Sequence, residues 1–264
     1  MFEITASLGA FGFGAIVGSF LNVCILRLPE GKSIVSPGSH CYGCGKPIVW
    51  YDNIPVFSFF ILGGRCRACR TKISPQYVIV EILTGLVFVL LYRRFGISVK
   101  GIIYVLISCA LVVESGIDLK YRIIPDFITL PGIGLGLGLS ALFPFLHSEQ
   151  SRMAGFLQSL VGILAGGGFL YASAIAAEFF LKKEAMGGGD IKLLGMLGAF
   201  LGWRGSFWII FVSSLIGSVF GVYQRLRHGE EAIPFGPYLA IAAFLYMLFG
   251  EQAIVWYSHY AGWS

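Results

Sequence analysis

Charged residues are scarce in this chain. Asp, Glu, Lys and Arg make up 12% of its 264 residues, whereas apolar residues make up 56% and the mean hydropathy is +0.80. Soluble domains carry roughly 25% charged residues, so this composition excludes an ordinary soluble domain and indicates an integral membrane protein. Each acid within an apolar stretch then needs a reason, because an ionisable group at membrane depth is costly.

Two further features are missing. No basic segment precedes the first apolar run and no small-residue cleavage site follows it, so we predict a retained membrane span rather than a cleaved signal peptide. No internal repeat is visible either, although inverted repeats are common in transporters. Both absences favour a polytopic protein of another class.

Apolar runs of spanning length recur along the chain, and we predict an all-α polytopic membrane protein with about eight transmembrane helices, seven being the alternative. The predicted spans are Thr5–Leu26, Gln76–Tyr92, Gly101–Ile117, Ile123–Leu146, Met153–Leu181, Ile191–Trp203, Ser206–Tyr223 and Phe235–Tyr257. The run Ile191–Trp203 is short, so we expect it to be tilted, kinked or only partly spanning.

The basic residues fix the expected orientation. With the N-terminus outside and eight spans, the inside loops hold most of the Lys and Arg residues, including Lys182 and Lys183. The outside loops hold Arg93, Arg94, Lys100, Arg152 and Arg204. Since basic residues near span ends favour the cytoplasm, we predict an inner-membrane protein whose inside loops face the cytoplasm.

A polar block interrupts the membrane pattern. We divide the chain into a first transmembrane helix (1–27), a small cytosolic module (28–75) and a membrane-embedded core (76–264). The module is too short for a stable apolar core without a staple. Cys41-x-x-Cys44 and Cys66-x-x-Cys69 supply one, because paired CxxC knuckles are typical of a structural zinc site with four thiolate ligands.

Alternatives to zinc remain open at this stage. The four cysteines could form two disulfides or redox-active pairs, although a cytoplasmic location argues against stable disulfides. His40, next to Cys41, is a weaker alternative ligand. Catalytic zinc is disfavoured, because four thiolates leave no coordination position for water.

Two acids carry the chemical interpretation. Asp118 ends an apolar run, at a helix C-terminus where negative charge is unfavourable, and Asp190 follows the glycine hinge Gly187-Gly188-Gly189. The glycines allow unusual backbone conformations and close approach of another chain. Two carboxyls held close cannot both ionise, so one can act as base on water while the other carries a proton.

Neighbouring residues offer milder interpretations. Pro125 suits the first turn of a helix, and Asp126 complements a helix N-terminus more readily than it serves in catalysis. In the alternative to a dyad, Asp190 is a helix N-cap and Asp118 pairs with Lys120 or Lys192. The other acids within spans, Glu81, Glu114 and Glu178, are expected to face the bundle interior or an aqueous cleft in supporting roles.

Several motifs occur together and in order. Gly187-Gly188-Gly189-Asp190-Ile-Lys-Leu, with Lys192, fits a GxGDxKL pattern, and Asp118 with Ile124-Pro125-Asp126 fits its partner segment. Ser19-Phe20-Leu21-Asn22-Val23 precedes the cysteine module. With these motifs the chain closely resembles the bacterial type IV prepilin peptidases, a family of GxGD aspartic proteases, from Gly18 to about Trp203. Glycine at the variable position, Gly188, is a mild departure.

The resemblance implies a function. It implies a membrane-embedded aspartic endopeptidase that removes the basic leader of type IV prepilins and of type II secretion pseudopilins at the cytoplasmic face, with Asp118 and Asp190 as catalytic residues. It also implies N-methylation of the new terminus with S-adenosylmethionine, although no residues mark that cofactor's site. The expected partners are these pilin precursors and membrane lipid, with no nucleic acid.

Two other classes predict different behaviour. A proton-coupled transporter would use Asp118 and Asp190 as a relay, but both acids are expected at one membrane face. A zinc-dependent membrane scaffold would depend on the cysteines and tolerate loss of the aspartates. Replacement of the aspartates separates all three.

Overall fold

A computed structural model describes residues 2–182, 187–228 and 234–260. Over these residues the chain is almost entirely helical. Within them it has no strands, and its β-structure is limited to two isolated β-bridges. Contacts divide it into two compact units, Met1–Ile117 and Asp118–Ser264, which are described separately. Lys183, which was counted among the inside-loop bases, lies outside the described residues. The predicted helical membrane fold is confirmed; the division at residues 27 and 75 stays a prediction.

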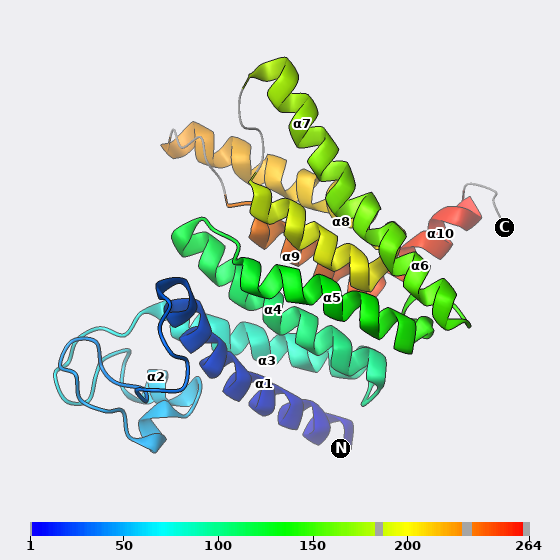
Figure 1. The fold of residues 1–264 in the computed structure, drawn as a ribbon. Coiled ribbons are helices and arrows are strands. Elements are labelled where there is room, and N and C mark those ends of the chain that lie inside the picture. The colour runs from blue at the N-terminus through cyan, green and yellow to red at the C-terminus, as the bar shows by residue number, and fades with distance from the viewer. Residues whose placement is uncertain (1, 183–186, 229–233, 261–264) are drawn as a thin grey trace. The chain divides into compact units, whose positions relative to one another are not determined.

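The first unit contains α1 (Phe2–Arg27), α2 (Phe57–Ile61), α3 (Pro75–Phe95) and most of α4 (Val99–Tyr121). In Figure 1, α1 and α3 lie side by side. Glycines allow this approach: a Cβ at Gly14 would lie 2.9 Å from the Gly85 Cα, and one at Gly18 would lie 2.9 Å from the Glu81 Cα. Small residues at such positions let membrane helices pack backbone to backbone.

The second unit contains α5 (Asp126–Leu142), α6 (Arg152–Ile163), α7 (Phe169–Leu181), α8 (Gly188–His228), α9 (Gly236–Leu245) and α10 (Glu251–Tyr260). A π-helical turn, Leu164–Gly168, joins α6 to α7, and another, Tyr246–Gly250, joins α9 to α10. The hydroxyls of Ser140 in α5 and Ser159 in α6 both donate to the Ala199 carbonyl in α8, at 3.1 and 2.7 Å. These buried hydrogen bonds hold three helices together without charged groups.

The label α8 covers two helices. Gly202 has φ 72° and ψ −179°, which is not helical. In a straight helix Ser206 would rise about 12 Å above Gly198. Instead, the Ser206 Oγ lies 2.8 Å from the position of a Cβ at Gly198, so the chain bends sharply between them. The predicted segments Ile191–Trp203 and Ser206–Tyr223 therefore correspond to the two parts of α8.

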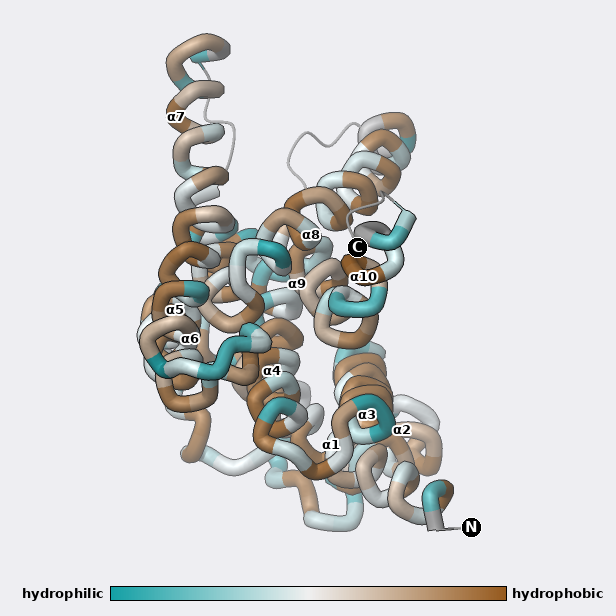
Figure 2. The backbone as a smooth tube through the Cα atoms, turned by 90° about the vertical axis from the view of Figure 1, so that its right-hand side faces the viewer, coloured by the Kyte–Doolittle hydropathy of each residue, from teal (hydrophilic) through white to brown (hydrophobic). Residues whose placement is uncertain are grey.

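Five helical stretches among the described residues are long and apolar enough to cross a membrane. They are Glu3–Glu30, Val99–Tyr121, Arg152–Phe180, Gly188–Tyr223 and Gly236–Trp256. With α3, the shorter α5 and the break in α8, eight apolar helical segments correspond to the predicted spans. Figure 2 shows hydrophobic residues along most of the helices, with hydrophilic ones gathered at helix ends and loops.

Candidate active site

Asp118 lies in the last turn of α4 and is 5% exposed. Its Oδ2 accepts a hydrogen bond of 2.9 Å from the backbone N–H of Gly236, the first residue of α9. The first N–H groups of a helix lack intrahelical partners, and the positive end of the helix dipole favours a nearby carboxylate. A Cβ at position 236 would lie 2.8 Å from the same oxygen, so this contact requires glycine.

Gly236 was missed by the sequence analysis. A signal was available, because Gly236-Pro237 opens the last apolar stretch and proline is favoured in the first helical turn. That pattern predicts where a helix begins. It does not predict which side chain will accept the glycine's N–H.

Asp190 lies in the first turn of α8, where its backbone N–H donates to the Gly187 carbonyl at 3.2 Å. The alternative of Asp190 as an N-cap is therefore wrong, because Gly187 precedes the helix. Gly188 and Gly189 of the hinge are helical and have no positive φ. A Cβ at Gly189 would lie 2.8 Å from the Ile124 Cβ, whereas Gly188 has nothing within 4 Å. The close packing against Ile124 therefore explains why position 189 is a glycine.

The structure brings the two predicted acids together within the second unit. The charge of Asp118 acts on the half-buried carboxyl of Asp190. The approach of Gly189 to Ile124 holds the start of α8 against the segment that follows Asp118. Two carboxyls whose charges interact disfavour the state in which both are ionised.

Asp126 and Lys192 form an ion pair beside these acids. The Lys192 Nζ donates to both carboxylate oxygens of Asp126, at 2.7 and 2.8 Å. The alternative pairing of Lys192 with Asp118 is therefore not the one observed. Asp126 is the first residue of α5, as predicted, and buried Pro125 is its N-cap rather than its first helical residue.

The remaining acids of the predicted spans divide into two kinds. Glu81 and Glu114 are buried, at 7% and 1% exposure, as expected. Glu178 is exposed near the end of α7, so of its two expected positions the bundle interior is wrong. A long side chain near a helix end can reach the membrane surface, which explains how an exposed acid is tolerated there.

The motif Ser19–Val23 has a structural role. Asn22 is fully buried, and its side-chain amide donates to the carbonyls of Gly18 and of Tyr77 in α3. Ser19, also in α1, hydrogen-bonds the side chain of Glu81 in α3. The motif therefore ties α1 to α3 through polar groups.

The four module cysteines form a cluster that could hold a metal ion. One ligand atom from each of Cys41, Cys44, Cys66 and Cys69 lies within 4.8 Å of the others. The Cys41 and Cys69 sulfurs are 3.7 Å apart, close to the separation of about 3.8 Å that follows from tetrahedral zinc–sulfur bonds of about 2.3 Å. All four are free thiols, so the disulfide alternative is not observed.

Each CxxC pair sits in a knuckle closed by its own backbone bonds. The Cys41 N–H donates to the Lys46 carbonyl, and the Cys66 N–H to the Thr71 carbonyl, both at 2.9 Å. The residue after each pair is left-handed, Gly45 with φ 69° and Arg70 with φ 60°. The left-handed position is therefore a glycine in the first knuckle and an arginine in the second.

Electrostatics of the cluster favour a bound cation. Hydrogen bonds from Thr71 lower the pKa of Cys69 to about 6. The backbone N–H of Lys46 lowers the pKa of Cys44, but burial and the neighbouring sulfurs outweigh it and raise the pKa to about 11. Four thiolates in this space repel one another, and a divalent cation relieves that repulsion.

Comparisons with known proteins cover both units. The Bacterial Peptidase A24 N-terminal domain matches residues 13–95, and the Type IV leader peptidase family matches residues 104–222. Relatives named prepilin leader peptidase/N-methyltransferase occur in several bacteria. That of Xanthomonas campestris is 36% identical, with 96% of this chain and 94% of the relative covered. That of Aeromonas salmonicida is 35% identical, with 94% and 92% covered.

A third relative, from Pseudomonas aeruginosa, carries the same name and is 36% identical over 95% of this chain and 93% of its own length. No solved structure matches the chain. The similarity extends over the cysteine module, both aspartate segments and nearly all of the predicted spans. On this evidence the chain belongs to the type IV leader peptidase family.

Proposed function

We propose that this protein is a membrane-embedded aspartic endopeptidase that cleaves the leader peptide of type IV prepilins and pseudopilins and methylates the new N-terminus. The proposal that Asp118 and Asp190 are its catalytic pair rests on one observation above the others. Two carboxyls, far apart in sequence, lie in one unit where the charge of Asp118 acts on Asp190, and Asp118 accepts the N–H of Gly236 at the start of α9. The names of the relatives, prepilin leader peptidase/N-methyltransferase, support the substrate class.

The hydrogen bond from Gly236 distinguishes the two acids. An N–H donor stabilises a carboxylate, so Asp118 suits the ionised member of the pair. As base, it takes a proton from a water molecule while the water oxygen bonds to the scissile carbonyl carbon. Asp190 carries the other proton and donates it to that carbonyl oxygen. When the C–N bond breaks, Asp118 passes the proton taken from water to the leaving amine, and Asp190 regains a proton from the diol hydroxyl as the carbonyl re-forms.

The supporting residues place these acids. Gly189 allows the start of α8 to pack on Ile124, and Gly187 leaves room for the Asp190 carboxyl, whose Oδ2 lies 3.3 Å from the position of a Cβ there. Asp126 and Lys192 link the start of α5 to α8 next to the pair. Pro125 sets the start of α5. Gly188 meets no neighbour, and we assign it no steric role.

The mature pilin released by cleavage is the substrate for the methylation. Cleavage creates a free amine, which is the nucleophile that a methyl donor requires, and S-adenosylmethionine supplies an activated methyl group. The N-methyltransferase part of the relatives' name supports this second activity. No described residue is assigned to the methyl donor.

Zinc is the metal that best suits Cys41, Cys44, Cys66 and Cys69. Four thiolates match its tetrahedral preference and fill its coordination shell, so its role would be structural. We place the module in the cytoplasm and the protein in the bacterial inner membrane, with Asp118 and Asp190 at the cytoplasmic ends of their helices. The distribution of basic residues supports this orientation.

Co-expression with a prepilin tests the proposal. Mass spectrometry of the pilin reads cleavage and N-methylation together. Asp118→Asn and Asp190→Asn should each abolish cleavage at normal protein abundance, because neither base nor proton donor can be replaced by an amide. Glu178→Gln, at an exposed acid of α7, is the matched control and should cleave normally. Wild-type cleavage by Asp190→Asn would refute the proposal, whereas the transporter alternative finds no support in the comparisons.

A further inference from the structure

An exposed apolar patch lies in the module, outside the membrane helices. Trp50, Phe57, Phe60 and Ile61 are 79%, 68%, 66% and 78% exposed. Phe57, Phe60 and Ile61 belong to α2, and Trp50 begins the short 3₁₀ helix Trp50–Asn53 just before it. Exposed clusters of large apolar side chains mark interaction surfaces, and tryptophan is favoured at membrane interfaces.

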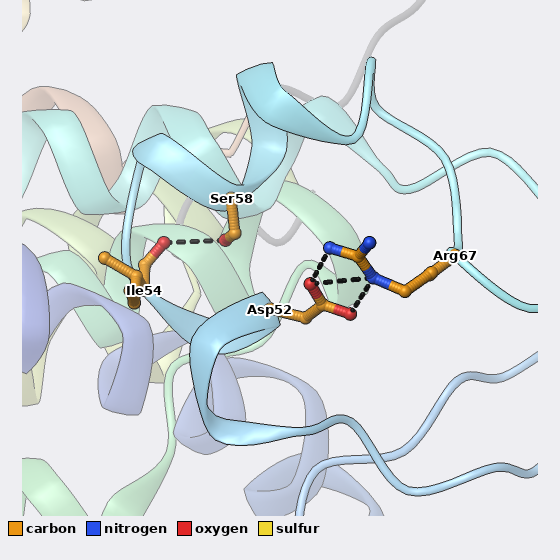
Figure 3. Close-up of polar contacts among 4 residues, drawn as sticks. All are labelled: Asp52, Ile54, Ser58 and Arg67. Carbon is orange, nitrogen blue, oxygen red and sulfur yellow. Dashed lines mark hydrogen bonds and ion pairs between the residues drawn. The ribbon is translucent and has the colours of Figure 1, made fainter.

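The patch is built on a rigid frame. Arg67, within the second cysteine knuckle, donates from Nε and Nη2 to both oxygens of Asp52, at 2.6 to 3.1 Å (Figure 3). At the other end, the Ser58 hydroxyl donates to the Ile54 carbonyl at 2.6 Å and closes the first turn of α2 (Figure 3). The ion pair between Arg67 and Asp52 therefore connects the cysteine cluster to the segment that carries the patch.

A buried carboxyl fixes where the patch sits along α3. The Glu81 Oε2 accepts a hydrogen bond of 2.7 Å from the backbone N–H of Val56, the residue before α2. Val56 has φ 66°, a rare conformation for a β-branched residue that persists only when its surroundings hold it. The start of α2 is thus held at the level of Glu81, about 9 Å into α3.

The surface of the helix pair at this level is apolar and outward-facing. Ile79 in α3 is 59% exposed and Phe20 in α1 is 48% exposed. Because Gly18 packs on Glu81, Ile79 and Phe20 both lie between that level and the helix ends that connect to the module. The lipid-facing surface therefore extends past the point at which α2 is attached. The start of α2, which carries most of the patch, therefore lies at the same level along the helices as the lipid-facing surface of α1 and α3.

Charge points to the same occupant. Residues 28–75 contain six Lys or Arg residues and only two acids, Glu30 and Asp52. Both acids are paired within the module, Glu30 with Lys32 and Asp52 with Arg67. The remaining charge is positive, which suits anionic lipid headgroups.

We propose that Trp50, Phe57, Phe60 and Ile61 insert into the lipid leaflet on the side where α1 ends and α3 begins, so that the cysteine module rests on the membrane. The occupant is the bilayer interface, rich in anionic headgroups. Glu81 is the positioning residue that sets the depth of insertion. The inference depends on α1 and α3 spanning the membrane and is independent of the proposed catalysis.

Depth-dependent fluorescence tests it. The full chain is reconstituted in nanodiscs of phosphatidylcholine and phosphatidylglycerol, with and without lipid brominated near the headgroup. Subtracting the spectrum of Trp50→Phe isolates the emission of Trp50. We expect the brominated lipid to remove most of that emission and aqueous iodide to remove little. The opposite pattern would overturn the proposal.

Matched variants sharpen the result. Val35 is 84% exposed in the module but outside the patch, so Val35→Trp in the Trp50→Phe background should be quenched by iodide and not by lipid. Phe60→Ser with Ile61→Ser should expose Trp50 to iodide while metal content stays unchanged. If Trp50 becomes shielded only when a prepilin is added, the patch binds protein and the lipid proposal is wrong. Prepilin cleavage is not measured, so failure here leaves the proposed function standing.

Discussion

The backbone N–H of Gly236 donates to the Asp118 carboxylate across 2.9 Å, although 118 positions separate the two residues. Through this bond the start of α9 holds one acid of the proposed pair. Position 236 requires glycine because a side chain there would collide with Asp118. The backbone conformation does not require it, since the φ of Gly236 is not positive.

Replacing this glycine should therefore impair cleavage. The Cβ of Gly236→Ala would lie 2.8 Å from the Asp118 Oδ2 and displace either the carboxyl or α9. A displacement of about 1 Å can lower a rate by about 10²-fold, and we expect a loss of that order in kcat for prepilin cleavage. Gly134→Ala, at a helical glycine with open space around it, is the control and should cleave normally. Equal activity of both variants would contradict the proposed role of Gly236.

The glycine hinge offers a second pair of variants. Gly189→Ala places a Cβ 2.8 Å from the Ile124 Cβ, so the start of α8 must shift and carry Asp190 with it. Gly188→Ala meets nothing within 4 Å. We expect the first variant to lose most of its cleavage activity and the second to retain it, measured on purified proteins of equal helicity. Loss in both would mean that the hinge needs flexibility at each position.

The ion pair between Asp126 and Lys192 should matter more for activity than for stability. Its side chains are 56% and 39% exposed, and such pairs contribute about 0–1 kcal/mol. Lys192→Met should change the unfolding free energy by less than about 1 kcal/mol. Cleavage should fall without vanishing, because the pair links two segments beside the catalytic acids. The double charge reversal Asp126→Lys with Lys192→Asp should recover part of it.

A different outcome would reassign Asp126. If Asp126→Asn abolished cleavage as completely as Asp190→Asn, Asp126 would itself be catalytic. Recovery of cleavage by the double charge reversal would instead assign the loss to the broken ion pair.

Metal content should follow the module cysteines and the pH. Elemental analysis should find one zinc per wild-type chain, none in Cys44→Ser, and a full complement in the control Cys109→Ala, whose thiol lies outside the cluster. Thiolates bind metal and thiols do not, so affinity falls as pH falls. Titration of metal content against pH should therefore show release on the acid side only. We expect Cys44→Ser to lower folding yield or methylation more than cleavage.

Absence of zinc from the wild-type protein would contradict the metal proposal. Retention of zinc by Cys44→Ser would instead return His40 to consideration as a ligand.

The features predicted from the sequence are those that physical chemistry makes conspicuous. Asp118 and Asp190 stood out because a carboxyl in an apolar surrounding is costly, and the four cysteines stood out through their spacing. Helical spans follow from long apolar runs. Each of these signals lies within a short stretch of sequence.

The contacts that position these groups are long-range and carry no local signal. The bond from Gly236 to Asp118, the pairing of Lys192 with Asp126, and the bond from Val56 to Glu81 depend on which helices meet. The hinge glycines were predicted for backbone freedom and for the close approach of another chain, and in the structure the missing side chain of Gly189 lets Ile124 of the same chain approach. Only packing distinguishes these two uses of glycine.

The two cysteine knuckles are separately closed, and a metal ion joining them would close the loop of residues 45–65 between them. Such a cross-link reduces the conformational entropy of the unfolded chain, by about 3 kcal/mol for a disulfide that closes a loop of about 15 residues. The whole apolar patch, from Trp50 to Ile61, lies inside this loop. A bound metal would thus supply the kind of restraint that secreted domains obtain from disulfides.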